Sequence, residues 1–68
     1  MNMKKVSNAI IAEVKKYGYY STRDYYYSEA WSGEENDYIV IRINKKEHTP
    51  GTVSWYNKSN WERVIPRV

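Results

Sequence analysis

Apolar residues recur every three or four positions near the start of the chain. They fall at Met3, Val6, Ile10, Val14 and Tyr17, and Ile11 widens the stripe. This spacing lines one face of a helix, so the pattern predicts an amphipathic helix over residues 3–17. Asn2 is the expected N-cap, and Gly18 is expected to end the helix in the left-handed conformation.

From residue 24 the pattern changes to alternation, which is typical of a β-strand. Between Asp24 and Trp31, one face carries Tyr25, Tyr27, Glu29 and Trp31, and the other carries Tyr26, Ser28 and Ala30. A polar turn is predicted over residues 32–37. A second strand is predicted over Tyr38–Asn44, with Ile39, Ile41 and Ile43 on one face and Tyr38, Val40 and Arg42 on the other.

The C-terminal third predicts a turn, a strand and a short helix. Pro50 and Gly51 occupy the two central places of a type II turn in the loop 45–52. A third strand is expected over roughly Val53–Asn57. Ser59 and Glu62 have the spacing of a capping box, which favours a helix that Pro66 ends.

Together these elements predict a single α+β domain spanning residues 1–68. The expected order is an N-terminal amphipathic helix, a three-stranded antiparallel sheet and a short C-terminal helix. We expect the isoleucine face of the sheet to pack on the first helix, which leaves an aromatic face exposed.

Composition explains why aromatic residues must take part in the core. The 68 residues include no Leu, Phe or Cys but eight Tyr and three Trp. Lack of cysteine excludes disulfides and thiolate metal sites. No apolar run approaches the ~20 residues of a membrane span, and no signal peptide is evident, so we expect a cytoplasmic protein. Abundant Lys, Asn, Ile and Tyr suggests a phage or plasmid accessory protein.

The tyrosine cluster of residues 17–27 is the main candidate for binding. Rings on a strand stack on bases or anchor a protein interface, and they also pack across a sheet as half-buried core. We expect one face of the strand to fill the core and the other to make contacts. The net charge of +3 permits attraction to phosphates without requiring it. The candidate binding residues are Tyr20, Arg23, Tyr25, Tyr26, Tyr27, Trp31, Tyr38, Arg42, Trp55, Tyr56 and Lys58.

Residues for catalysis are few. His48 is the only histidine, and with Arg42 and Glu47 it offers the groups of a metal-independent ribonuclease. Glu34, Glu35 and Asp37 match no calcium-binding loop and suit a solvated turn. We therefore predict no catalytic residue, no metal site and no cofactor.

The predicted order of elements resembles that of the double-stranded-RNA-binding domain and of HicA-type toxins. The stretch IIAEVKKYGYY is similar to the first helix of these toxins, and PGTVSWYNKSN resembles the Gly-Thr run before their last helix. The Gly-Ser-His motif that carries the toxins' catalytic histidine is missing, because residues 28–31 read Ser-Glu-Ala-Trp. The resemblance therefore implies a topology and assigns no catalytic residue.

These observations favour a small, non-catalytic binding protein. The expected target is nucleic acid or a nucleic-acid-handling protein, bound through an aromatic, mildly basic sheet face. The alternative is a protein-binding inhibitor of a host or defence enzyme, in which Tyr, Trp and Arg anchor the interface. A small ribonuclease toxin is the third hypothesis, and a homodimer formed through the aromatic face stays open.

Overall fold

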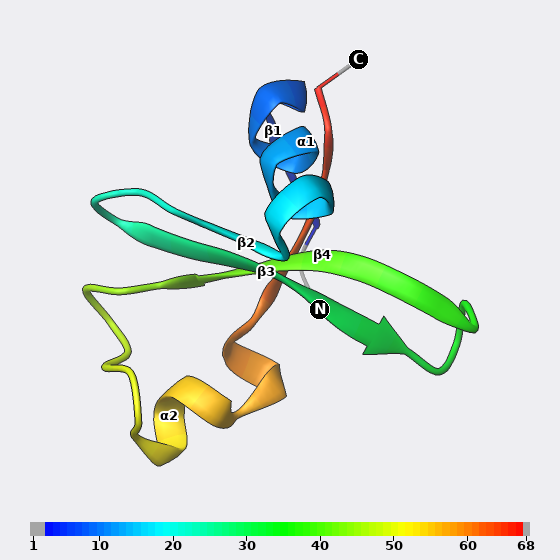
Figure 1. Cartoon of the computed structure of the whole chain (residues 1–68). Helices are drawn as coiled ribbons and strands as arrows, with labels where there is room; N and C mark the ends of the chain where they lie inside the picture. The colour runs from blue at the N-terminus through cyan, green and yellow to red at the C-terminus, as the bar shows by residue number, and fades with distance from the viewer. Residues whose placement is uncertain (1–2, 68) are drawn as a thin grey trace.

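The computed structural model describes residues 3–67 and shows an α+β fold (Figure 1). The α+β class, the N-terminal helix and a short helix in the C-terminal part are as the sequence predicts. The sheet is mixed rather than purely antiparallel as predicted, because β1 and β5 pair in parallel. The sheet has five strands rather than the three expected. The elements are β1 Met3–Val6, α1 Asn8–Tyr17, β2 Tyr19–Ser21, β3 Tyr25–Ser32, β4 Asp37–Asn44, α2 Val53–Tyr56, the single 3₁₀ turn η1 Lys58–Asn60, and β5 Glu62–Pro66.

The first helix begins later than its apolar spacing predicts. Residues 3–6 form β1, and Ser7 caps α1 by accepting a hydrogen bond from the Ala9 amide at 3.2 Å. The predicted cap at Asn2 lies outside the described residues. Val6 fits both a helical stripe and a strand, and pairing with β5 gives these residues backbone partners that a frayed first turn lacks. Gly18 ends the helix as predicted, with φ 88°.

In the C-terminal part, a helix forms where a strand is predicted, and a strand forms where a helix is predicted. Residues 53–56 form α2 instead of a strand, because the Thr52 hydroxyl caps the Trp55 amide at 3.2 Å. The predicted helix after Ser59 is one 3₁₀ turn followed by β5. Val64 and Ile65 are β-branched, and their side chains alternate between the two faces of the sheet. The turn around Gly51 forms as predicted, with φ 86° and a Thr52 amide to Thr49 carbonyl bond of 3.2 Å.

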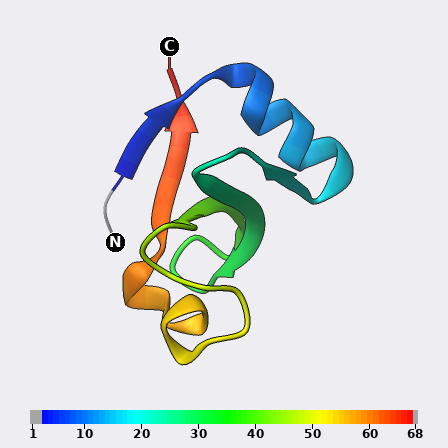
Figure 2. The ribbon, with the colours of Figure 1, turned by 90° about the vertical axis from the view of Figure 1, so that its left-hand side faces the viewer.

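The strands follow the order β1-β5-β4-β3-β2. β1 and β5 are parallel and lie side by side, so the first and last described strands are neighbours and the two ends of the described chain lie at opposite ends of the pair (Figure 2). The other pairs are antiparallel, and β3 and β4 form a long hairpin in which Tyr27 faces Arg42 and Trp31 faces Tyr38. The described chain begins with strand β1 and ends with strand β5. Its order of elements therefore differs from that of HicA-type toxins and RNA-binding domains, in which a helix, three strands and a second helix follow one another.

The helix covers the opposite face from the one expected. The buried cluster under α1 contains Val6, Val14, Tyr27, Val40 and Val64, so α1 packs on the valine and tyrosine side of the hairpin. The prediction that Ile39, Ile41 and Ile43 lie under this helix is wrong. Both faces of the hairpin are apolar enough to be covered. The path of α1 determines which face it covers, because the helix crosses from β1 at one edge of the sheet to β2 at the other.

The isoleucine face is covered in part by the C-terminal segment. α1 and α2 lie on opposite sides of the sheet (Figures 1 and 2). The Trp55 ring of α2 contacts Tyr26, which is paired with Ile43 in the hairpin, and Ile43 is 2% exposed. Ile39, nearer the hairpin tip, stays half-buried. The α2 side of the sheet is therefore closed at one end and open at the other.

Candidate functional site

The structure divides the predicted binding residues between the two faces of the sheet. On the α1 face it places Tyr20, Tyr25, Tyr27, Trp31, Tyr38 and Arg42, as the strand register requires. On the α2 face lie Tyr26 and Trp55, whose ring centroids are 5.6 Å apart. Arg23 lies in the β2–β3 turn, Tyr56 on α2 and Lys58 in η1, and all three side chains are exposed. A single aromatic platform does not form.

Three of the predicted binding tyrosines belong to the core. Tyr27 is 3% exposed, and Tyr20 and Tyr25 pack beside it with ring centroids 6.3 and 6.2 Å from its own. The buried Tyr27 hydroxyl also has a hydrogen-bond partner, since Arg42 donates to its oxygen at 3.5 Å. These rings supply the buried volume that Leu and Phe provide in other proteins.

Arg42 is a structural residue as well. Its guanidinium lies 3.9 Å from the Tyr25 ring centroid and donates through Nε to Glu62 Oε1 at 2.8 Å. Lys4 reaches the other Glu62 oxygen at 3.8 Å. Burial by itself lowers the pKa of Arg42, but the hydrogen bonds to Tyr27 and Glu62 outweigh it and hold that pKa above its ordinary value.

A row of three rings crosses the α2 face. Tyr19 stacks on Tyr26 with centroids 6.2 Å apart and planes at 20°, and Tyr26 contacts Trp55 in turn. Tyr19 is 54% exposed, whereas the other two rings are half-buried. The set predicted from sequence omits Tyr19, because a strand of three residues gives too short an alternation to place it.

Cations gather beside this row. Ser21 is paired with Tyr26, so its hydroxyl lies on the ring side, and it accepts a hydrogen bond from the Lys45 ammonium, which also donates to the Thr22 carbonyl at 2.7 Å. Arg23 and Lys46 both contact the Asp24 carboxylate, at 3.2 and 3.4 Å. The ring row therefore borders three cations, of which Arg23 and Lys46 share the Asp24 carboxylate. We call Arg23, Lys45 and Lys46 the basic cluster.

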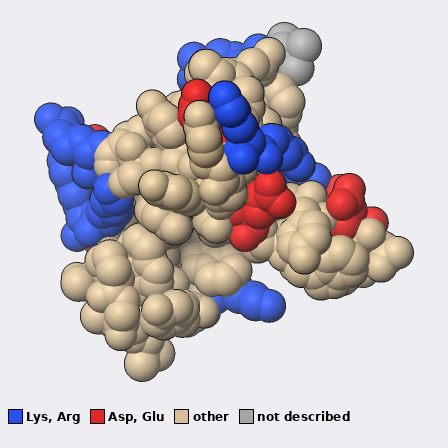
Figure 3. All heavy atoms as spheres, in the orientation of Figure 1, with Lys and Arg blue, Asp and Glu red and all other residues tan. Residues whose placement is uncertain are grey.

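Charge is unevenly distributed over the molecule. Lys and Arg atoms form one group at the end that holds the β2–β3 turn and another over α1, whereas acidic atoms lie near the middle of this face and toward the tip of the β3–β4 hairpin (Figure 3). Arg23 holds the pKa of Asp24 below its ordinary value by a hydrogen bond, and Lys46 contributes in the same direction. An anionic ligand is accordingly attracted to the end of the basic cluster.

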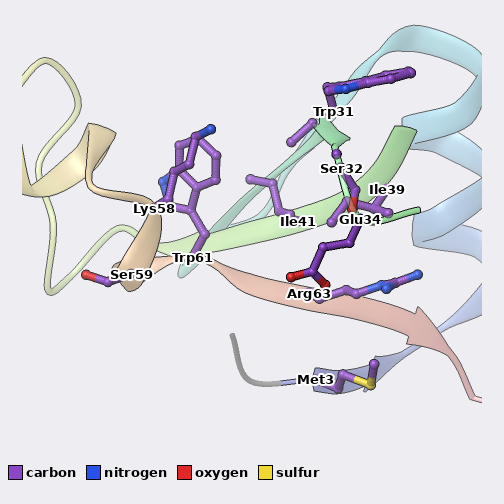
Figure 4. Close-up of a pocket in the computed structure, with 12 residues that line it drawn as sticks. Met3, Trp31, Ser32, Glu34, Ile39, Ile41, Lys58, Ser59, Trp61 and Arg63 are labelled. Carbon is purple, nitrogen blue, oxygen red and sulfur yellow. The ribbon is translucent and has the colours of Figure 1, made fainter. Parts of the chain in front are cut away.

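A groove lies at the other end of the α2 face. It has a volume of about 520 Å³ and is lined by Ile39, Ile41 and Trp61, with Met3 at its margin. Trp31 belongs to the α1 face by strand register, but it lies at the hairpin end of the sheet and also borders this groove. Figure 4 shows Trp61 and Lys58 on one side of this space and Trp31 and Glu34 on the other. Trp31 also makes an edge-to-face contact with Tyr38 at 5.2 Å, and these two rings are 56% and 54% exposed.

The residues of the ribonuclease hypothesis do not converge. His48 Nδ1 is hydrogen-bonded to the Ser54 hydroxyl of α2, while its Nε2 lies 3.9 Å from Glu47. Arg42 is engaged by Glu62 as described above. His48 therefore joins the loop 45–52 to α2, and its ring is 17% exposed. Among residues 3–67, no three His, Asp or Glu side chains cluster closely enough to hold a metal ion.

Comparisons of the chain with models of known protein families, with curated proteins and with solved structures find no match. Within the described part of the chain, no helix is long and apolar enough to cross a membrane.

Proposed function

We propose that the protein is a non-catalytic binding module for single-stranded nucleic acid. The observation that supports this function is the contiguity of the Tyr19–Tyr26–Trp55 row with the basic cluster. Aromatic rings bind unpaired bases by stacking, at about 1–3 kcal/mol per base, and neighbouring cations hold the phosphates. Tyr19 is the most exposed of the three rings in the row, so it is the principal stacking residue.

Unpaired strands suit this surface better than duplexes. The rings lie on a sheet between β2 and α2 and offer faces for stacking, whereas a duplex hides the faces of its bases. Three cations imply few phosphate contacts, so binding is weak and falls as salt rises, with a logarithmic slope of roughly 0.7 per contact. The acidic hairpin tip repels phosphates, which directs the strand away from the groove.

The test is fluorescence anisotropy with labelled single-stranded DNA and RNA homopolymers, measured from ~50 to ~200 mM salt. Tyr19→Ala is expected to weaken binding about fivefold or more, the loss of one stacked base. Tyr38→Ala is the matched control, because Tyr38 has the same 54% exposure but lies at the acidic tip. Comparison of the two sugars shows whether the 2′-hydroxyl is recognised.

Charge is tested in the same assay. Lys46→Ala is expected to weaken binding and to reduce the salt slope by about one phosphate contact, whereas Lys16→Ala on α1 leaves both unchanged. Absence of binding at low salt, or equal losses for Tyr19→Ala and Tyr38→Ala, contradicts the proposed function.

A further inference from the structure

The outer half of the β3–β4 hairpin extends beyond its neighbouring strands. β2 pairs with β3 as far as Ser28, and β5 pairs with β4 at Ile41 and Arg42. Within the described chain, residues 37–40 have no ladder partner on the side away from β3. The backbone groups on that edge are available to an added strand, a common mode of peptide recognition.

This part of the chain is strongly acidic although the whole protein is basic. Between Tyr27 and Arg42 the sequence contains four carboxylates and no Lys or Arg. One carboxylate, Glu35, is neutralised by Arg63 at 2.6 Å. The remaining carboxylates, Glu29, Glu34 and Asp37, are close in sequence to the exposed Trp31–Tyr38 pair. Aromatic rings in such a setting suit a cationic partner and disfavour a nucleic acid.

The groove beside this hairpin supplies an apolar site. Ile39 and Ile41 come from β4, and Trp61 encloses them from the start of β5. The Trp61 ring is fixed, because its indole N–H donates to the Trp55 carbonyl at 2.9 Å. A pre-formed apolar groove with fixed walls accepts a bulky side chain at low entropic cost.

The two ends of the groove differ in charge. Glu34 lies at the hairpin end, where it reaches across toward Arg63, and Lys58 lies at the other end beside Trp61 (Figure 4). Arg63 is already paired with Glu35 and adds no free positive charge. An occupant is thus expected to present a cation to the hairpin end, an apolar side chain to the middle and no cation to Lys58.

We propose that the groove binds an extended segment of a protein partner in which a bulky apolar residue is flanked on one side by Lys or Arg. The apolar residue enters the space between Trp61 and Ile39, the cation pairs with Glu34, and the backbone aligns with the free edge of β4. This site is separate from the ring row, and its existence does not depend on nucleic-acid binding.

The experiment is selection from a displayed library of random linear peptides against the folded protein. Enriched peptides are expected to share a Trp, Phe, Leu or Ile next to Lys or Arg. Binding of a selected peptide, measured by anisotropy, is expected to weaken about tenfold in Glu34→Lys and in Trp31→Ala. Glu47→Lys makes the same change of charge outside the groove and is expected to have no effect, as is Tyr19→Ala in the ring row.

Several outcomes overturn the proposal. One is the absence of any enriched sequence, and another is enrichment of peptides without Lys or Arg. Equal weakening by Glu34→Lys and Glu47→Lys shows that the attraction is not local to the groove. Light scattering that finds a dimer, broken by Trp31→Ala, assigns the groove to a second copy of the chain instead.

Discussion

Arg42 and Glu62 face each other across the β4–β5 ladder, with 2.8 Å between Nε and Oε1. Their side chains are 14% and 24% exposed, and the two residues form one of only two ladder pairs between these strands. Because the ladder is so short, this ion pair is a main tie between the hairpin and the β1–β5 pair.

Glu62→Gln is expected to lower the free energy of unfolding by roughly 2–3 kcal/mol, because a half-buried guanidinium loses its counter-charge. Urea denaturation followed by tryptophan fluorescence measures this. Glu35→Gln is the control, since it breaks the more exposed pair with Arg63 and is expected to cost about 1 kcal/mol or less. Equal losses would show that the central pair has no special role.

Acid is expected to weaken the contact of Asp24 with Arg23 and Lys46. The pKa of Asp24 is lowered in the folded protein, so the unfolded chain binds more protons and stability rises with pH. Its contribution is complete above the unfolded pKa of ~3.9 and disappears as the pH falls through the lower folded value. Asp24→Asn should therefore be less stable than wild type near neutral pH and equal to it in strong acid.

Denaturation at a series of pH values tests this difference. In a protein that also carries Arg23→Ala and Lys46→Ala, Asp24→Asn is expected to leave the pH dependence of stability unchanged, because the cations that lower the pKa of Asp24 are gone. A pH-dependent effect that persists in this background would assign the shift to another cause.

Valine 14 is the centre of the core under α1, with no exposed area, whereas Val53 at the start of α2 is 88% exposed. Val14→Ala is expected to destabilise the protein by about 2 kcal/mol through lost burial and a small cavity. Val53→Ala makes the same chemical change and is expected to lie within about 0.5 kcal/mol of wild type. Thermal unfolding of the two variants shows how much of the lost stability comes from the packing of Val14 and how much from replacing any valine by alanine.

Gly18 has φ 88° at the end of α1, and a Cβ there meets no atom within 4 Å. Gly18→Ala is therefore expected to cost about 1 kcal/mol from backbone strain alone. Gly33→Ala is the control, because Gly33 also has open space but no positive φ. If both variants unfold at the same urea concentration, the left-handed cap does not contribute to stability.

The central part of the fold could be predicted because its signals are local. Gly18, the turn at Gly51 and the alternation through Ile39, Ile41 and Ile43 are determined by backbone preferences within a few residues. The hairpin and the body of α1 follow from these signals. The choice of face could not be predicted, since it depends on the path of α1 between the two edges of the sheet.

The secondary structure predicted for the two ends of the described chain is wrong for a related reason. Residues 3–6 and 62–66 are strands because they pair with each other, and a local pattern carries no information about a partner so distant in sequence. The same holds for the binding residues. Strand register places Tyr27 in the core, Arg42 in the partly buried pair with Glu62 and Tyr19 in the ring row.

The pairing of Met3 with Arg63 has a consequence for biosynthesis. The ribosome makes β1 well before its partner β5, so the β1–β5 edge of the sheet cannot close until β5 has been synthesised. The nascent polypeptide is expected to stay open until β5 emerges. A stalled or truncated product without β5 would then be a substrate for cellular proteases rather than a folded fragment.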